Sequence, residues 1–148
     1  MKTIKEILLF IWQLPQNLLG GLVLLIKSRH KSVYKLILRM KKVTVYYVPN
    51  FAESGISLGR WIIIDKIVLL ASSYNFGMTV IRHEFGHQRQ SLYLGWLYLV
   101  VIGLPSLCGN IIDRIFHKKW TRARRTKWYY SQPWEKWADK LGGVERWY

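Results

Sequence analysis

Two long stretches of the chain contain no charged side chain, residues 7–26 and residues 90–112. The first is long enough to cross a bilayer, but Pro15 and the pair Gly20–Gly21 interrupt it. We expect it to form an interfacial helix or a short membrane anchor, and an amphipathic helix packed on the rest of the chain is the alternative. The second stretch is a transmembrane candidate by its length and composition.

Residues 43–71, between these stretches, are typical of β-strands. Val43–Val48 is rich in β-branched and aromatic residues. Trp61–Ile64 and Ile67–Leu70 flank Asp65–Lys66, which predicts a hairpin turn. Since a helical stretch follows, the pattern predicts an α+β fold with a small, mostly antiparallel sheet packed on helices.

Residues 78–90 predict a partly buried helix, because apolar residues recur along them and no proline interrupts them. The helix carries the sequence H-E-F-G-H, from His83 to His87, which is an HExxH motif. Residues four apart share one face of a helix, so both imidazoles can bind one zinc ion. Glu84, beside the first ligand, can act as general base towards a water that the zinc activates.

A catalytic zinc site needs a third protein ligand. A metzincin would have a third histidine at position 93, but this chain has Tyr93 there. The better candidate is Glu135, which begins an ExxxD sequence ending at Asp139, on a helix expected to start at Pro133. One of these carboxylates can bind zinc, and the other can accept the N–H of a ligating histidine. The other candidates are His117, Cys108, Asp113 and Glu145.

The HExxH motif followed by ExxxD resembles the gluzincins, the thermolysin-like zinc metallopeptidases, in a minimal single-domain form. The resemblance extends from the strands near residue 55 to Gly143. It implies a zincin-like fold with five site residues: His83, His87 and Glu135 as zinc ligands, Glu84 as the base, and Asp139 orienting a histidine.

The gluzincins also have an edge strand before the active-site helix, to which a peptide substrate adds as an extra strand. Gly55–Ile64 is the candidate in this chain. The resemblance therefore implies that a peptide or protein substrate lies along Gly55, Ile56, Ser57, Leu58 and Gly59.

The zinc hypothesis constrains the apolar stretch 90–112. If this stretch crossed a membrane once, His83 and Glu135 would lie on opposite sides and could not share a metal. We therefore expect a buried helix, a re-entrant hairpin turning near Gly103–Pro105, or two helices in one leaflet. The chain then divides into a membrane-associated N-terminal segment, residues 1–42, and a zincin-like catalytic domain, residues 43–148, into which the apolar stretch is inserted.

Positive charge is concentrated in two clusters, residues 27–42 and residues 114–127, and the formal net charge is +15. Basic clusters beside apolar segments indicate binding to anionic lipid headgroups, and the positive-inside rule places both on the cytoplasmic side. Nucleic acid is a weaker candidate partner, because the chain has no nucleic-acid-binding motif. The single cysteine, Cys108, excludes an intrachain disulfide.

Together these patterns predict a membrane-associated, zinc-dependent hydrolase on the cytoplasmic face of a membrane, and the resemblance to gluzincins implies that it is a metallopeptidase. The alternative belongs to another functional class: a non-catalytic membrane-surface binding or scaffold protein with a structural metal. The substitution Glu84→Gln separates the two, since only the peptidase needs the carboxylate as a base.

Overall fold

The protein has an α+β structure with mostly helical content and one small sheet. The computed structural model describes residues 3–29, 34–38, 43–49, 55–65 and 74–146. The helical elements are α1 (Ile4–Trp12), α2 (Leu14–Ser28), α4 (Tyr74–Leu94), a 3-10 turn η1 (Gly95–Leu97), a π-helical turn η2 (Leu99–Gly103), α5 (Leu104–Phe116), α6 (Arg122–Tyr130) and α7 (Pro133–Gly142).

The sheet has four strands, in the order β1 (Tyr34–Leu38), β2 (Val43–Val48), β4 (Trp61–Asp65) and β3 (Gly55–Leu58). The outer pairs β1–β2 and β3–β4 are antiparallel, as expected, but β2 and β4 are parallel, so the sheet is mixed. Strand β1 lies within the basic stretch 27–42 and pairs with β2. The sheet therefore extends across the boundary that we expected at residue 42.

A tight turn at Gly59 and Arg60 joins β3 to β4. Gly59 has a φ of 60°, a conformation that favours glycine in two-residue hairpin turns. The amide of Arg60 donates to Oδ1 of Asn17 at 2.9 Å, which ties the turn to α2. The turn predicted at Asp65–Lys66 and the strand predicted at Ile67–Leu70 extend into residues that lie outside the described ones.

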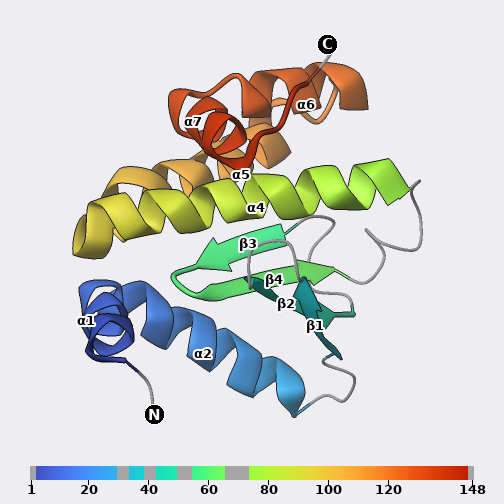
Figure 1. Cartoon of the computed structure of the whole chain (residues 1–148). Coiled ribbons are helices and arrows are strands. Elements are labelled where there is room, and N and C mark those ends of the chain that lie inside the picture. The colour runs from blue at the N-terminus through green and yellow to red at the C-terminus, as the bar shows by residue number, and fades with distance from the viewer. Residues whose placement is uncertain (1–2, 30–33, 39–42, 50–54, 66–73, 147–148) are drawn as a thin grey trace.

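Figure 1 shows the sheet between α2 on one face and α4 on the other, with α7 on the far side of α4. The core lies between the sheet and α4, where Val45, Ile62 and Ile64 pack against Ile81. Strand β4 contains three consecutive isoleucines, Ile62–Ile64, all of them buried, because helices cover both faces of the strand. The helix predicted for residues 78–90 is confirmed, and it is part of the longer α4.

The N-terminal apolar stretch forms two helices, since α1 and α2 meet at an angle of 86°. The second apolar stretch contains the end of α4, η1, η2 and most of α5. Its sharp turn is at Gly95, which has a φ of 53°, whereas the chain stays helical through Gly103. The chain therefore turns earlier than near Gly103–Pro105, where the re-entrant hairpin, one of the three expected arrangements, would have placed the turn.

Among the described residues, Leu99–Phe116 is long and apolar enough to cross a membrane. The bent pair α1–α2 would count as a second such segment if it formed one broken span.

Candidate metal centre

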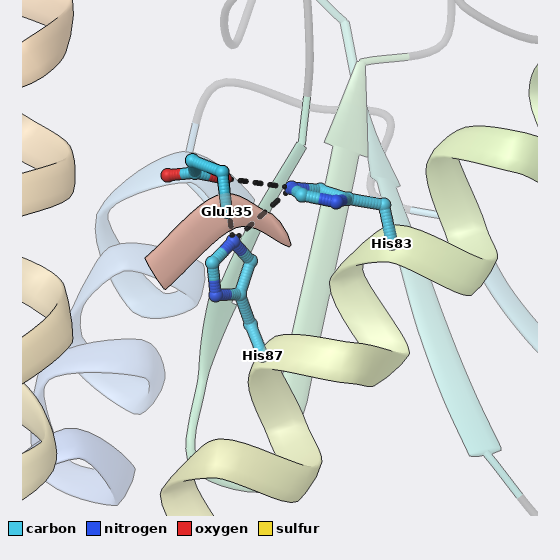
Figure 2. A group of neighbouring side chains, drawn as sticks. All are labelled: His83, His87 and Glu135. Carbon is cyan, nitrogen blue, oxygen red and sulfur yellow. Dashed lines mark hydrogen bonds and ion pairs between the residues drawn. The ribbon is translucent and has the colours of Figure 1, made fainter. Parts of the chain in front are cut away.

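Helices α4 and α7 bring three predicted ligands to one point. His83 and His87 lie one turn apart on α4, and Glu135 is in the first turn of α7 (Figure 2). Glu135 Oε2 is 3.0 Å from His83 Nε2 and 3.2 Å from His87 Nε2, and the two Nε2 atoms are 3.1 Å apart. All three side chains are buried. The group could hold a metal ion.

The other ring nitrogen of each histidine, Nδ1, is hydrogen-bonded to a side-chain oxygen. His83 Nδ1 is 2.7 Å from Asp139 Oδ1, and His87 Nδ1 is 2.7 Å from Gln90 Oε1. The amide nitrogen of Gln90 donates to the carbonyl of Trp134 at 2.8 Å, which leaves its oxygen facing His87. Each Nδ1 therefore carries a proton and donates it.

This choice of tautomer leaves lone pairs on both Nε2 atoms in the neutral imidazoles. They face each other and the carboxylate of Glu135, so three acceptors meet in a buried space. Such a group is stable only with a cation between the acceptors, which is a metal ion or a proton.

The electrostatics of the metal-free group follow from the same contacts. Burial acts to lower the pKa of His83, but its hydrogen bonds to Asp139 and Glu135 outweigh burial and raise that pKa to about 9. Burial acts to raise the pKa of Glu135, but hydrogen bonds from His83 and His87 hold it well below its usual range. Without a metal, a proton on His83 therefore supplies the positive charge.

Two further groups fix the carboxylates. Arg146 donates to both oxygens of Asp139, at 2.7 and 3.0 Å, and its guanidinium lies over the ring of Tyr130. Ser106 of α5 donates to Glu135 Oε1, which leaves Oε2 to face the imidazoles. Burial acts to raise the pKa of Asp139, but its bonds to His83 and Arg146 lower it. Asp139 thus lies where it can accept the Nδ1 proton of His83, the role that the resemblance implies for it.

The close approach of α4 and α7 depends on glycine. A Cβ atom at Gly86 would lie 1.9 Å from the carbonyl oxygen of Ala138, and one at Gly142 would lie 2.0 Å from that of Arg82. Only hydrogen at these two positions lets the helices cross this closely. The crossing places Glu135 beside the two histidines.

Glu84 is buried on the side of the group that faces the sheet. A Cβ atom at Gly55 would lie 2.8 Å from Glu84 Cγ, so glycine makes room for the carboxylate beside β3. Burial raises the pKa of Glu84 above its ordinary value, although His87 and His83 act in the opposite direction. A carboxylate with a raised pKa is suited to accept and return a proton.

Strand β3 is at one edge of the sheet and passes Glu84. Ile56 is exposed, whereas Ser57, Leu58 and Gly59 are buried. The hydroxyl of Tyr98 donates to the carbonyl of Ser57 at 3.0 Å, and this contact occupies part of the strand edge. The role of these strand residues as a substrate edge stays a prediction.

The other ligand candidates lie elsewhere. His117 bonds Asp113 at 3.2 Å and stacks on Trp120, and Asp113 also accepts from Arg125. Cys108 is exposed on α5. Glu145 is exposed beyond α7.

The sequence patterns missed four residues of the site. Gln90 accepts from His87, Ser106 donates to Glu135, and Arg146 donates to Asp139. The ring of Tyr130 contacts the ring of His83 edge-on, with the ring centroids 5.0 Å apart. Gln90 follows His87 by three residues, which is helical spacing and was a usable signal. The other three come from α5, α6 and the segment after α7, and no spacing rule links them to α4.

Comparison of the chain with known protein families, with curated proteins and with solved structures found no match. The resemblance to gluzincins therefore rests on the two motifs and on the group that they form, which could hold a metal ion.

Proposed function

We propose that the protein is a zinc-dependent peptidase of the gluzincin type, with a zincin-like fold. The observation that carries this proposal is that three buried side chains direct lone pairs towards one point. The Nδ1 atoms of the two histidines are hydrogen-bonded to Asp139 and Gln90, and the second oxygen of Glu135 is hydrogen-bonded to Ser106. Two imidazoles and one carboxylate are a donor set that catalytic zinc sites use. Donors about 2.0–2.2 Å from a tetrahedral ion lie roughly 3.3 Å apart. The separations of 3.0 to 3.2 Å agree with that spacing.

Each residue has a role in peptide hydrolysis. Zinc at such a site supplies a Lewis acid that lowers the pKa of water and polarises a carbonyl group. Asp139 and Gln90 keep Nδ1 of the two histidines protonated, so that both Nε2 atoms are free to bind the metal. Glu84 accepts the proton of the attacking water and then delivers it to the departing amine.

The proposed substrate is a peptide or protein that lies along the edge of β3. The part of this edge nearest to Glu84 is Gly55, where the absence of a side chain leaves space for the carboxylate. A peptide added there would align with the sheet by main-chain hydrogen bonds. The contact between Tyr98 and Ser57 would have to open for such a peptide to pair along the whole of Gly55–Gly59.

The proposed location is the cytoplasmic face of a membrane. Basic residues are found at residues 27–42 and 114–127, and cytoplasmic segments of membrane proteins are enriched in Lys and Arg. Anionic lipid headgroups are the partner that this charge favours, ahead of nucleic acid.

A second candidate function is a non-catalytic membrane-surface binding or scaffold protein with a structural metal. The observation that favours it is the depth of the site, since Glu135 has no exposed surface and both histidines are buried. Structural metal sites are closed in this way, whereas catalytic sites keep one position open.

The substitution Glu84→Gln tests the first function against the second. The carboxamide has nearly the same shape but cannot act as a base, so zinc content should be unchanged and hydrolysis of a random mixture of quenched fluorescent peptides should fall by at least about 100-fold. The matched control is Glu145→Gln, which removes an exposed carboxylate outside the group. Hydrolysis that survives in the Glu84→Gln variant would contradict the role of Glu84, and a zinc-loaded parent without hydrolysis would favour the scaffold.

A further inference from the structure

The region where α1 meets α2 has its polar side chains inside and its apolar side chains outside. Gln16 has no exposed surface, whereas Leu18 is 60% exposed and Leu22 is 51% exposed. The amide of Gln16 donates to Ser91 Oγ at 3.0 Å and to the carbonyl of Gly95 at 2.8 Å. Proteins surrounded by water show the opposite distribution, with leucine buried and glutamine exposed.

The same reversal continues over η1, η2 and α5. Most of their exposed side chains are apolar, although α5 also exposes Asn110 and Arg114, and α1 adds more apolar ones. Two indole N–H groups join α1 to the end of α4 and to η1: Trp12 donates to the carbonyl of Leu92, and Trp96 donates to that of Ile11, both at 2.8 Å. We call the exposed apolar side chains of α1, α2, η1, η2 and α5 the apolar belt, which includes Leu8, Leu22, Trp96, Val100, Leu107 and Phe116.

Charge is placed at one end of each long helix of the belt. Helix α2 has no charged residue before Lys27 in its last turn, and α5 has Arg114 in its last turn, followed by Lys118 and Lys119. Apolar helices that end in basic residues match the profile of a bilayer, in which anionic headgroups border the hydrocarbon.

We propose that the apolar belt is inserted into the hydrocarbon of a lipid bilayer, with the basic last turns of α2 and α5 at the headgroups. The amide nitrogen of Gln16 then keeps its hydrogen bonds to Ser91 and to the carbonyl of Gly95 away from lipid, as the interior of a membrane protein requires. A second copy of the chain is the less suitable occupant, because the net charge of +15 opposes self-association and favours anionic lipid. This inference goes beyond the proposed function, since headgroup binding by basic residues alone would leave the belt in water.

Insertion also places the metal centre close to lipid. Ser106 of α5 contacts Glu135, while Leu104 and Leu107 beside it are exposed parts of the belt. The metal ligands are therefore about one helix diameter, roughly 10 Å, from the proposed lipid surface.

The single cysteine allows a direct test, because Cys108 is exposed on α5. The full chain is incorporated into vesicles of phosphatidylcholine and phosphatidylglycerol and treated with a charged, membrane-impermeant maleimide. A second probe, Leu22→Cys with Cys108→Ser, reports on α2. The matched control is Lys136→Cys with Cys108→Ser, which places a cysteine at an exposed position of α7 outside the belt.

Insertion predicts that Cys108 and the cysteine at position 22 react at least about tenfold more slowly than the control, because hydrocarbon suppresses the reactive thiolate. Equal labelling of all three positions in vesicles would overturn the proposal. Protection that occurs equally without lipid, in a chain that migrates as a dimer, would assign the belt to a second copy and would also overturn it. Far-ultraviolet circular dichroism, measured for each variant, shows whether the substituted chains are folded, independently of zinc binding.

Discussion

Gly86 of α4 lies directly against the main chain of Ala138 of α7, so that a Cβ atom at position 86 would be 1.9 Å from the carbonyl oxygen of Ala138. This contact sets how closely the two helices cross. Since His83 and His87 flank Gly86 and Glu135 is one turn before Ala138, the crossing also sets the size of the candidate metal site.

The substitution Gly86→Ala should therefore separate α4 from α7. We expect a loss of about 1–3 kcal/mol in the free energy of unfolding, typical of overpacking, together with weaker zinc binding. The control is Gly103→Ala, where a Cβ atom would meet nothing closer than 3.5 Å. Chemical unfolding and zinc titration measure both effects, and a Gly86→Ala chain that binds zinc as tightly as the parent would contradict this role of the crossing.

Gln90 should act on the metal through His87, because its side-chain oxygen accepts the Nδ1 proton of His87 at 2.7 Å. Replacing it with methionine keeps the size of the side chain and removes the acceptor. We expect zinc affinity to fall by about 10–100-fold, the usual effect of losing a partner of a ligating histidine. Competition with a zinc chelator measures the affinity, with Gln88→Met on the same helix as the control. Equal affinities in the two variants would exclude this role.

The stability of the metal-free protein should depend on pH through His83. The pKa of His83 is raised from 6.5 to about 9, so its stabilising contribution is complete below pH 6.5 and is lost as the pH rises towards 9. Glu84, whose pKa is also raised, acts in the same direction. The lowered pKa values of Glu135 and Asp139 affect stability only in acid, below this window.

Zinc should reverse this dependence, because it binds Nε2 of His83 only when that atom carries no proton. The increase in melting temperature on adding zinc should therefore be larger at pH 9 than at pH 6. Thermal unfolding with zinc and with a chelator measures both trends. A melting temperature of the metal-free chain that is constant between pH 6.5 and 9 would contradict the assigned charge state of His83.

The parts of the site that could be predicted from the sequence are those that helical spacing brings together. His83 and His87 share a face of α4, and Glu135 and Asp139 share a face of α7, so each pair follows from a separation of four residues. The prediction that the two pairs meet rested on the chemistry of zinc, because no spacing rule relates residue 87 to residue 135. Ser106 was missed because it lies in an apolar stretch that looks like lipid-facing helix, while its hydroxyl points inward to Glu135.

The fold, too, could be predicted from the sequence only in part. The β-rich character of residues 43–65 is visible in their side chains, but the parallel pairing of β2 with β4 is not, because strand order depends on the connections and on the covering helices. A hairpin turn near Gly103–Pro105 was one of the arrangements expected for residues 90–112, but the chain turns at Gly95. This turn depends on the positive φ of Gly95, on the ring of Trp12 that lies against it, and on the hydrogen bond from Trp96 to the carbonyl of Ile11. These last two are contacts between distant parts of the sequence.

The most direct test of the metal centre is the zinc content of the purified full chain, measured beside His87→Ala, Glu135→Ala and the control Glu145→Gln. The account predicts one zinc per chain in the parent and in the control, and none in the two ligand variants. A parent chain that remains free of metal after zinc is supplied would contradict it, as would full zinc retention in Glu135→Ala.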